Sequence, residues 1–239
     1  MPLNEFCRTE LLVGEEGIAK LHNSKVIVFG IGGVGSFVVE ALTRAGVGNL
    51  ILVDNDTICI SNINRQIHAR QSTIGMIKVE AMKERVISIN PNCNVEAKQV
   101  FITADNISEI IPSDVDYVVD AIDTVTSKLA LAEYCYKNNI NIISSMGTGN
   151  KIDPTQFRVS DVFKTKVCPL AKVMRYELKK RGVKKLKVVY SEEMPMTPDK
   201  GRAVPSGKRQ TPGSISFVPP VAGMIIGGEV IKDLIGINK

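Results

Sequence analysis

The sequence predicts an α/β protein: a Rossmann-like, doubly wound and mostly parallel sheet with a basic C-terminal lobe. Short apolar runs alternate with segments of helical periodicity over the first half of the chain, which is the pattern of parallel strands joined by crossover helices. A glycine-rich turn separates the first apolar run from the helix that follows it. A chain of 239 residues with 44% apolar side chains can also bury one sizeable core.

The elements of the first half follow one another in a regular order. A helical lead-in over 5–22 precedes the first strand. Predicted strands, each a short run rich in apolar residues, cover 25–29, 49–53, 95–101, 116–120 and 140–143. Predicted helices cover 34–45, 74–90 and 126–138, and Pro91 ends the second of them.

The pattern changes after Gly147. A polar stretch is followed by a strongly basic helix over 169–181, a short strand over 186–190, a Pro/Gly-rich loop over 194–213 and an apolar helix over 220–235. We expect residues 151–239 to form the substrate-binding part of the protein, continuous with the domain that residues 1–150 begin.

Composition excludes several classes of protein. No basic-then-apolar leader opens the chain, and the apolar stretch 214–226 is interrupted by Pro219 and Pro220 and is too short to span a bilayer. We therefore expect a soluble, cytoplasmic protein without a membrane partner. The five cysteines form no CxxC pair, so neither a four-thiolate zinc site nor a disulfide framework is expected.

Formal charge is distributed unevenly. The whole chain carries +5, but residues 1–150 hold 12 Lys+Arg against 17 Asp+Glu, and residues 151–239 hold 18 against 8. Between Lys164 and Lys187, ten basic residues accompany one acid, Glu177. A positive field on one lobe suits a polyanionic partner such as a nucleic acid backbone. The alternative is an ordinary solvated basic helix.

Four glycines, Gly30, Gly32, Gly33 and Gly35, lie between the first strand and its helix. Their missing side chains permit a tight turn and let backbone amides approach a phosphate at the helix N-terminus. Asp54 ends the next strand, where its carboxylate can accept hydrogen bonds from ribose hydroxyls. The spacing predicts a nucleotide site, with one of the four glycines serving only close helix–sheet packing.

A polar cluster after the second strand distinguishes two kinds of nucleotide. It comprises Asn62, Asn64, Arg65 and Gln66, with Lys78 on the following helix. A glycine loop and a helix end can satisfy the pyrophosphate of a dinucleotide, whereas a triphosphate and its departing pyrophosphate also need cations. Arg65 can bind phosphate through two nitrogens, and Lys78 can add a point charge. The cluster favours ATP over NAD; the alternative is a solvated surface cluster.

Two carboxylates, Asp120 and Asp123, flank the end of the fourth strand in the stretch DAID. Strand ends of such sheets face the ligand crevice, and a carboxylate there can hold the magnesium ion that accompanies ATP. Asp123, just beyond the strand, is the predicted metal ligand. In the alternative interpretations Asp123 caps the next helix and Asp120 orients a neighbouring loop.

The combination of GxGGxG at 30–35, DxDxxxxSNxNRQ at 54–66, Lys78 and DAIDT at 120–124 resembles the ubiquitin-activating-enzyme-like adenylyltransferase superfamily. That group includes the molybdopterin-synthase and thiamine-biosynthesis adenylyltransferases. The resemblance implies ATP and Mg²⁺ as cofactors, adenylation of a carboxylate, release of pyrophosphate and a homodimer. Residues 1–150 would then be an ATP-binding adenylation core with an N-terminal helical arm.

Carried over by position, the resemblance assigns roles to individual residues. The glycines at 30–35 would cradle phosphate, and the two acids Asp54 and Asp56 would belong to the nucleotide site, with Asp54 on the ribose. The residues that would contact the triphosphate are Asn64, Arg65 and Lys78. Asp123 would hold the metal, and Arg8 matches an arginine that such proteins insert into the partner subunit's site. The implied catalytic residues are Arg8, Arg65, Lys78 and Asp123.

Two absences bear on which carboxylate is activated. Sulfur-carrier enzymes of this superfamily typically hold zinc with two CxxC pairs, and this chain has none. Ubiquitin-type activators carry a catalytic cysteine in a dedicated segment. Cys168 is the only thiol placed in a plausible loop, where it is either a nucleophile or an ordinary loop residue.

Three further stretches resemble the tRNA threonylcarbamoyladenosine dehydratases: SSMGTGNKIDPTQFRVSDVFKT, PLAKVMRYELKKRG with VVYSEE, and GSISFVPPVAGMIIGGEVIKDL. The resemblance then covers nearly the whole chain. It implies that ATP adenylates the threonine carboxylate of the modified adenosine beside the tRNA anticodon. The ureido nitrogen of the same nucleoside would attack, AMP would leave, and a five-membered ring would form with loss of one water.

The implied partner is tRNA, and we expect its contacts from the basic segment, at Lys172, Arg175, Lys179, Lys180, Arg181, Lys184 and Lys185. Because the attack is intramolecular, proximity comes from the substrate and no cysteine is required. Of the two histidines, His22 is expected to end a helix and His68 is a candidate base. Relatives often carry an acid before PL, where this chain has Cys168.

Three rival interpretations remain open from the sequence. The first is an adenylyltransferase that activates the C-terminal glycine of a ubiquitin-like or sulfur-carrier protein. The second is an NAD-dependent oxidoreductase, and the third is a non-catalytic nucleotide-binding tRNA module. Some members of the dehydratase family are linked to cysteine-desulfurase sulfur transfer, and these residues neither support nor exclude such a partner.

Overall fold

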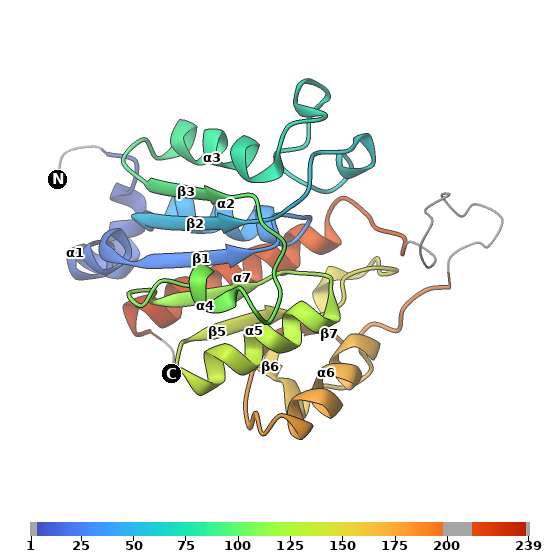
Figure 1. Ribbon diagram of the computed structural model, residues 1–239. Helices are drawn as coiled ribbons and strands as arrows, with labels where there is room; N and C mark the ends of the chain where they lie inside the picture. The colour runs from blue at the N-terminus through green and yellow to red at the C-terminus, as the bar shows by residue number, and fades with distance from the viewer. Residues whose placement is uncertain (1–3, 198–211, 238–239) are drawn as a thin grey trace.

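The computed structural model describes residues 4–197 and 212–237. One sheet runs through the molecule in the strand order β3-β2-β1-β4-β5-β7-β6 (Figure 1). Its strands are β1 (Lys25–Phe29), β2 (Asn49–Val53), β3 (Asn94–Lys98), β4 (Tyr117–Asp120), β5 (Ile142–Ser145), β6 (Phe157–Asp161) and β7 (Lys187–Ser191). All neighbours pair in parallel except β6 and β7, which are antiparallel. The prediction of a mostly parallel α/β sheet is confirmed.

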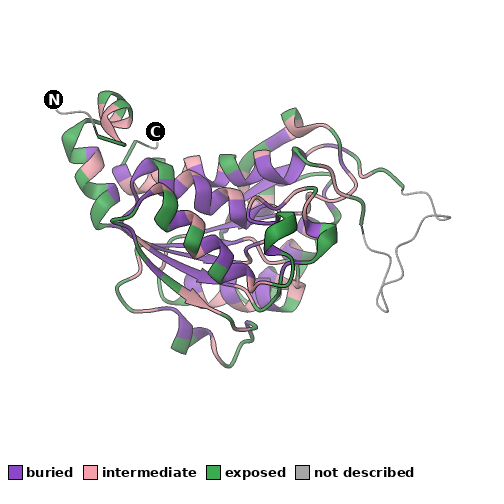
Figure 2. Cartoon of the chain, turned by 90° about the horizontal axis from the view of Figure 1, so that it is seen from above, coloured by how far each residue is buried: buried purple, intermediate pink, exposed green. Residues whose placement is uncertain are grey.

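Helices cover both faces of this sheet, as expected for a doubly wound fold (Figures 1 and 2). The helices are α1 (Cys7–Asn23), α2 (Gly35–Ala45), α3 (Lys78–Ile89), α4 (Ile107–Ile110), α5 (Val125–Lys137), α6 (Pro169–Lys180) and α7 (Val218–Ile235). On one face α2, α3 and α7 share an apolar core with the sheet. On the other face α4 and α5 pack on the centre of the sheet and α6 packs near β7.

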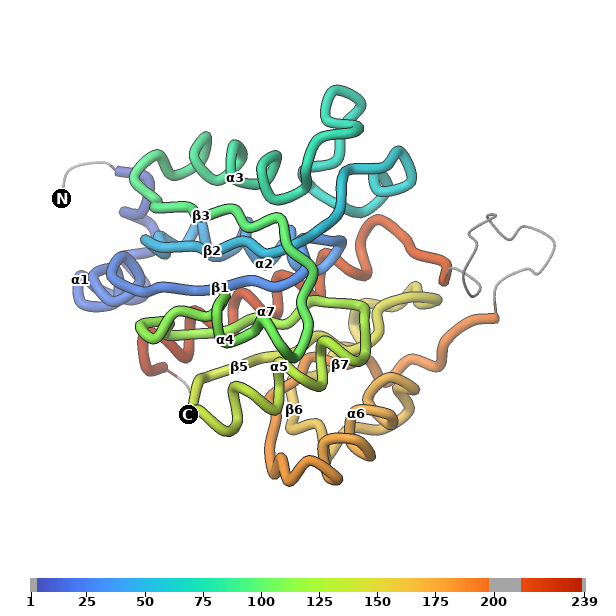
Figure 3. Tube along the Cα trace, viewed as in Figure 1, coloured from blue at the N-terminus to red at the C-terminus, as the bar shows by residue number. Residues whose placement is uncertain are grey.

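Strands β1 and β2 are apolar after their first residue, as expected for strands with both faces covered. In β1, Val26 and Val28 point into the core beside α2 and α7, while Ile27 and Phe29 point into the core beside α5. All four side chains are fully buried. Because β1, β2 and β4 run in parallel, their carboxyl ends lie on the same side of the sheet, on the right in Figure 3 (Figure 3).

The boundaries of several predicted elements differ from the observed ones by a few residues. The strand predicted over 95–101 is observed as Asn94–Lys98, and two further differences have local reasons. The helix predicted over 74–90 begins only at Lys78, because Gly75 has φ +88 and Ile77 bridges Thr57. The strand predicted over 140–143 is shifted to Ile142–Ser145, because the N–H of Ile140 still closes the end of α5 on the carbonyl of Cys135.

Among the strands and α-helices of the described residues, one strand and one short helix were not predicted. The edge strand β6 lies in the segment interpreted as a polar stretch, and α4 is a single helical turn. The strands β7 and β6, which come from residues after 151, extend the same sheet that residues 1–150 begin. Most of the loop predicted over 194–213, with Lys200, Arg202, Lys208 and Arg209, lies outside the described residues.

Over residues 4–197 and 212–237, none of the helices combines the length and the apolar character needed to cross a membrane.

Candidate functional site

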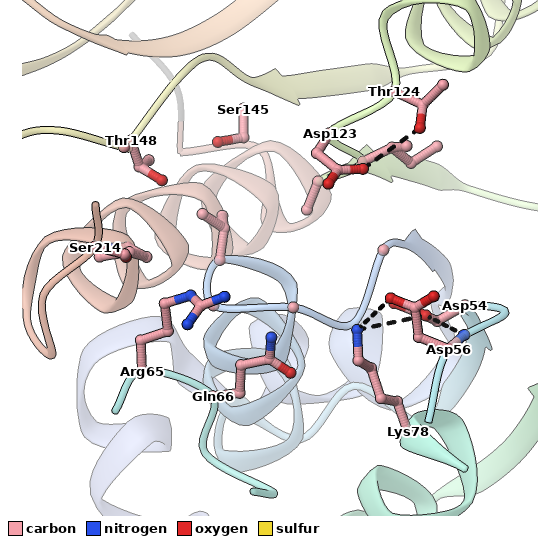
Figure 4. Close-up of a pocket in the computed structure, with 18 of the residues that line it drawn as sticks. Asp54, Asp56, Arg65, Gln66, Lys78, Asp123, Thr124, Ser145, Thr148 and Ser214 are labelled. Atoms are coloured by element: carbon pink, nitrogen blue, oxygen red, sulfur yellow. Dashed lines mark hydrogen bonds and ion pairs between the residues drawn. The ribbon is translucent and has the colours of Figure 1, made fainter. Parts of the chain in front are cut away.

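A cavity of about 580 Å³ opens at the carboxyl ends of β1, β2, β4 and β5 (Figure 4). Five segments that follow strands line it, within 30–34, 53–56, 100–102, 121–124 and 145–149. Residues 212–214 close a further side. Open α/β sheets bind their ligands in this crevice, so the fold itself brings the predicted motifs together.

The glycine loop has the tight geometry that the sequence predicts. Gly30 has φ +85, a conformation that side chains disfavour. A Cβ at Gly35 would lie 1.8 Å from the carbonyl oxygen of Gly30, so Gly35 is required by the turn itself and does not line the cavity. A Cβ at Gly32 meets nothing closer than 3.9 Å. Helix α2 starts beside the cavity. The N–H groups of Ser36 and Phe37 already donate to the carbonyls of Gly32 and Val34, so the amides available to an anion are those of the glycine loop before the helix.

Asp54 fastens the glycine loop to the end of β2. Its Oδ2 accepts a hydrogen bond from the N–H of Ile31 at 2.7 Å, and its Oδ1 accepts one from the N–H of Asp56 at 2.9 Å. Each carboxylate oxygen can accept a second hydrogen bond. Asp54 therefore positions the loop and still has acceptor capacity toward the cavity.

Lys78 is a buried cation at the floor of the cavity. It opens α3 and is 5% exposed, with its Nζ 2.7 Å from Asp56 Oδ2 and 3.9 Å from Asp54 Oδ1 (Figure 4). A buried ammonium needs compensating negative charge. The two acids provide it and hold the ammonium beside the cavity.

The residues of the polar cluster after β2 have different positions relative to the cavity, and the sequence did not indicate which of them line it. Asn62 and Gln66 are buried and line the cavity together with Arg65. Asn64, predicted to contact the triphosphate, is not a lining residue. Its Oδ1 accepts a hydrogen bond from Arg65 at 2.8 Å, and its Nδ2 donates to the carbonyl of Ser214. Asn64 thus orients the guanidinium.

The fourth strand ends in two acids with different environments. Asp120 is fully buried and ion-paired to Lys128 on α5 at 2.8 Å. Asp123 is exposed on the loop before α5 and lines the cavity beside Thr124 (Figure 4). The cap of α5 is Thr124, without a side-chain hydrogen bond, so the helix-capping alternative for Asp123 is wrong.

Arg8 lies far from the cavity of its own chain. It is exposed on α1, which leads into the amino end of β1, whereas the cavity is at the carboxyl ends of the strands (Figure 1). Arg8 is not among the lining residues. Any role of Arg8 in this site requires a second chain.

The basic segment is exposed for most of its length. Six of the seven predicted tRNA contacts are exposed: Lys172, Lys179, Lys180, Arg181, Lys184 and Lys185. Arg175 is half-buried and donates to the carbonyl oxygen of Thr165 at 3.0 Å, which ties α6 to the preceding turn. Arg181 is paired with Glu133 at 3.4 Å. Of the seven predicted tRNA contacts, Arg175 is therefore engaged inside the fold.

Cys168, His22 and His68 are not among the residues that line the cavity. Cys168 is 2% exposed at the start of α6, inside an apolar cluster. His22 lies in the last turn of α1, as predicted. His68 is 2% exposed, and its Nε2 contacts the carbonyl of Ile31 at 2.8 Å, beneath the glycine loop. Burial lowers the pKa of His68.

Comparison with known proteins agrees with this geometry. The model of the ThiF family matches residues 6–239. The chain belongs to the ThiF family. It is 46% identical, over 98% of its length and 95% of the relative, to the tRNA threonylcarbamoyladenosine dehydratase of Bacillus subtilis. It is 44% identical to the Escherichia coli protein of the same name over 73% of this chain and 65% of the relative.

Solved structures place this ThiF-family chain close to the same enzyme. The E. coli tRNA N6-threonylcarbamoyladenosine dehydratase in complex with ATP is 36% identical, with a TM-score of 0.88 over 98% of this chain and 94% of that one. Its complex with AMP gives a TM-score of 0.90 with the same coverage. The fold class inferred from the motifs is therefore confirmed.

Proposed function

We propose that this ThiF-family chain catalyses the ATP-dependent cyclising dehydration of threonylcarbamoyl-modified adenosine beside the tRNA anticodon. The observation that carries the proposal is the near full-length similarity to a dehydratase of that name. The cavity supports it, because a glycine loop and two cations, Arg65 and Lys78, border one space. The more distant adenylyltransferase and sulfurtransferase relatives match only about 60% of the chain, for example 36% identity over 63%.

The cavity fits ATP. Gly32 leaves room where a side chain would block a phosphate, and the glycine loop before α2 offers backbone amides. When bound, ATP supplies the adenylyl group that activates the threonine carboxylate and the pyrophosphate that leaves. Arg65 and Lys78 neutralise the charge of the departing phosphates. Asp54, with acceptor capacity to spare, binds the ribose.

We assign Mg²⁺ to Asp123. Over the described residues there is no cluster of three or more His, Cys, Asp or Glu side chains that could hold a metal ion by itself. Magnesium at nucleotide sites is held by one or two carboxylates together with phosphates and water. The exposed carboxylate of Asp123 on the cavity wall suits that mode of binding.

The remaining wall of the cavity accommodates the modified nucleoside. It is formed by residues 145–149, Leu170 and 212–214, with two glycines among residues 145–149. The attacking nitrogen and the activated carboxylate belong to the same nucleoside, so the protein needs to activate and position the substrate. Neither Cys168 nor His68 is exposed enough to take part.

The proposal includes a homodimer and a cytoplasmic location. Arg8 can meet an active site only if a second copy provides one, since its own cavity lies at the other end of the sheet. The tRNA substrate places the reaction in the cytoplasm. No sulfur-transfer partner is needed for the chemistry.

The test is mass spectrometry of tRNA that carries the threonylcarbamoyl modification. After incubation with the protein, ATP and magnesium, the digested nucleosides are weighed. Loss of one water from the modified adenosine, dependent on ATP, supports the proposal. An unchanged mass, with ATP binding shown in a control, would reject it and direct attention to a protein carboxylate.

A further inference from the structure

Tyr176 occupies the centre of the solvent face of α6. The side chains of Ala171, Met174 and Leu178 pack inward and are fully buried. At 3.6 residues per turn, the direction opposite these three side chains falls on Tyr176. The neighbouring exposed positions are Lys172, Val173, Lys179 and Lys180. Lys172, Tyr176 and Lys180 follow one another at intervals of four residues and form one ridge along the helix, the α6 ridge.

The Tyr176 ring is largely exposed and contacts a neighbouring cation. Its exposed fraction is 63%. The ammonium of Lys180 lies 3.9 Å from the ring centroid and covers one face of the ring. An exposed ring beside a cation offers a surface on which a base can stack.

Helix α6 starts at the cavity. Leu170, in the first turn of α6, lines the cavity wall, and the helix leads away from it. Tyr176 follows Leu170 by six residues, so it lies about 9 Å farther along the helix axis. A strand whose modified nucleoside occupies the cavity would place its neighbouring nucleotides over this surface.

The charge around Tyr176 favours a polyanionic strand. Lys172, Lys179 and Lys180 surround the ring, and Lys184 and Lys185 follow the helix. The single acid of the helix, Glu177, is half-buried and paired with Lys180 and Arg181. Aromatic rings among cations bind single-stranded nucleic acid, because the ring stacks on a base while the cations contact phosphates.

We propose that Tyr176 is a stacking platform for an unpaired base of the anticodon loop, with Lys172 and Lys180 on the flanking phosphates. This inference rests on the proposed function and adds to it the residue that holds the loop next to the modified nucleoside. The platform acts in binding and not in the chemical step.

The experiment compares Tyr176→Leu with Tyr176→Phe in the full chain. Equilibrium binding of the modified tRNA is measured over a range of salt concentrations, together with KM and kcat for dehydration. Loss of base stacking should weaken binding about 5- to 150-fold in Tyr176→Leu, while Tyr176→Phe keeps the ring and should stay within about twofold. The salt slope should be the same in both, since no charge is removed.

Lys180→Gln and a distant control, Lys20→Gln on α1, complete the comparison. Lys180→Gln should reduce the salt slope by about 0.7 to 0.9, and Lys20→Gln should leave it unchanged. KM for tRNA should rise in Tyr176→Leu without a fall in kcat. Equal binding by Tyr176→Leu and the unaltered protein would overturn the stacking role. If the unaltered protein fails to dehydrate the modified tRNA, the proposed function fails first, and this inference with it.

Discussion

The ammonium of Lys128 and the carboxylate of Asp120 lie 2.8 Å apart, and neither side chain is reached by solvent. The same carboxylate accepts hydrogen bonds from the N–H of Ile122 at 3.1 Å and from the hydroxyl of Ser144. One buried acid therefore links β4, α5, β5 and the loop that carries Asp123. The pair therefore fixes the segments that follow β4 and β5, which form two walls of the cavity, relative to each other.

Lys128→Met should destabilise the protein by about 3–5 kcal/mol, because it leaves the Asp120 carboxylate buried without a cation. Chemical denaturation measures the change. The double variant Asp120→Asn, Lys128→Met removes both charges and should lose less stability than Lys128→Met alone. Additive losses in a double-mutant cycle would show that the two groups do not depend on each other.

Lys78→Ala should reduce ATP-dependent pyrophosphate release at least about 100-fold, since one preorganised cation is lost from the site of developing charge. The affinity for tRNA should remain nearly unchanged, because Lys78 is 5% exposed at the cavity floor and the basic helix is untouched. Lys83→Ala, a half-buried lysine on the same helix, is the matched control. Normal turnover by Lys78→Ala would reject the assignment of this site.

The sequence predicted the central strands of the sheet well and missed the edge strand β6. The runs around Val28 and Leu52 are apolar because both faces are covered, and that signal is local. Strand β6 alternates imperfectly, with Val159 exposed, and exists only because β7 offers an edge. An edge strand of this kind depends on tertiary pairing that local propensity does not encode.

The site was predicted at the level of motifs and less well at single side chains. Asn62 and Asn64 share a motif, but the turn directs Asn62 inward and Asn64 toward Arg65. Lys128 was missed, because a helical lysine is normally exposed and only the fold reveals its buried partner. Gln66 was noted in the cluster, yet its burial in the cavity wall has no sequence signature.

Gly35→Ala should reduce the stability of the fold, whereas Gly32→Ala should reduce ATP affinity and leave the stability nearly unchanged. A methyl group at Gly35 would lie 1.8 Å from the Gly30 carbonyl oxygen, so stability should fall by more than about 3 kcal/mol. At Gly32 the space is open, and stability should change by less than about 0.5 kcal/mol. ATP affinity should nevertheless fall in Gly32→Ala, because the methyl group occupies the approach of a phosphate. Thermal unfolding and calorimetric titration with ATP measure both effects, and normal ATP binding by Gly32→Ala would contradict the assignment of this loop.

His68 should make stability depend on pH. Burial lowers the pKa of His68 below its ordinary value of 6.5, so the folded state favours the neutral ring and the unfolded state binds the proton more readily. The stabilising contribution is present above pH 6.5 and is lost as the pH falls from 6.5 toward the lowered pKa. Denaturation between pH 7 and pH 5 should show this loss, and His68→Gln should lack it. A His68→Gln curve parallel to that of the unaltered protein would reject the role of this histidine.

Mixing Arg8→Ala with Lys78→Ala should restore activity that neither variant has alone. If Arg8 completes the site of the partner subunit, a mixed dimer contains one site with both Lys78 and a partner's intact arginine. With random exchange about half of the dimers are mixed, and each holds one working site, so about a quarter of full activity is expected. Dehydration rates after subunit exchange measure it, and two Lys78→Ala preparations mixed together are the control. Full activity of Arg8→Ala alone would place Arg8 outside the catalytic site, and a mixture as inactive as its components would contradict its action in the partner subunit's site.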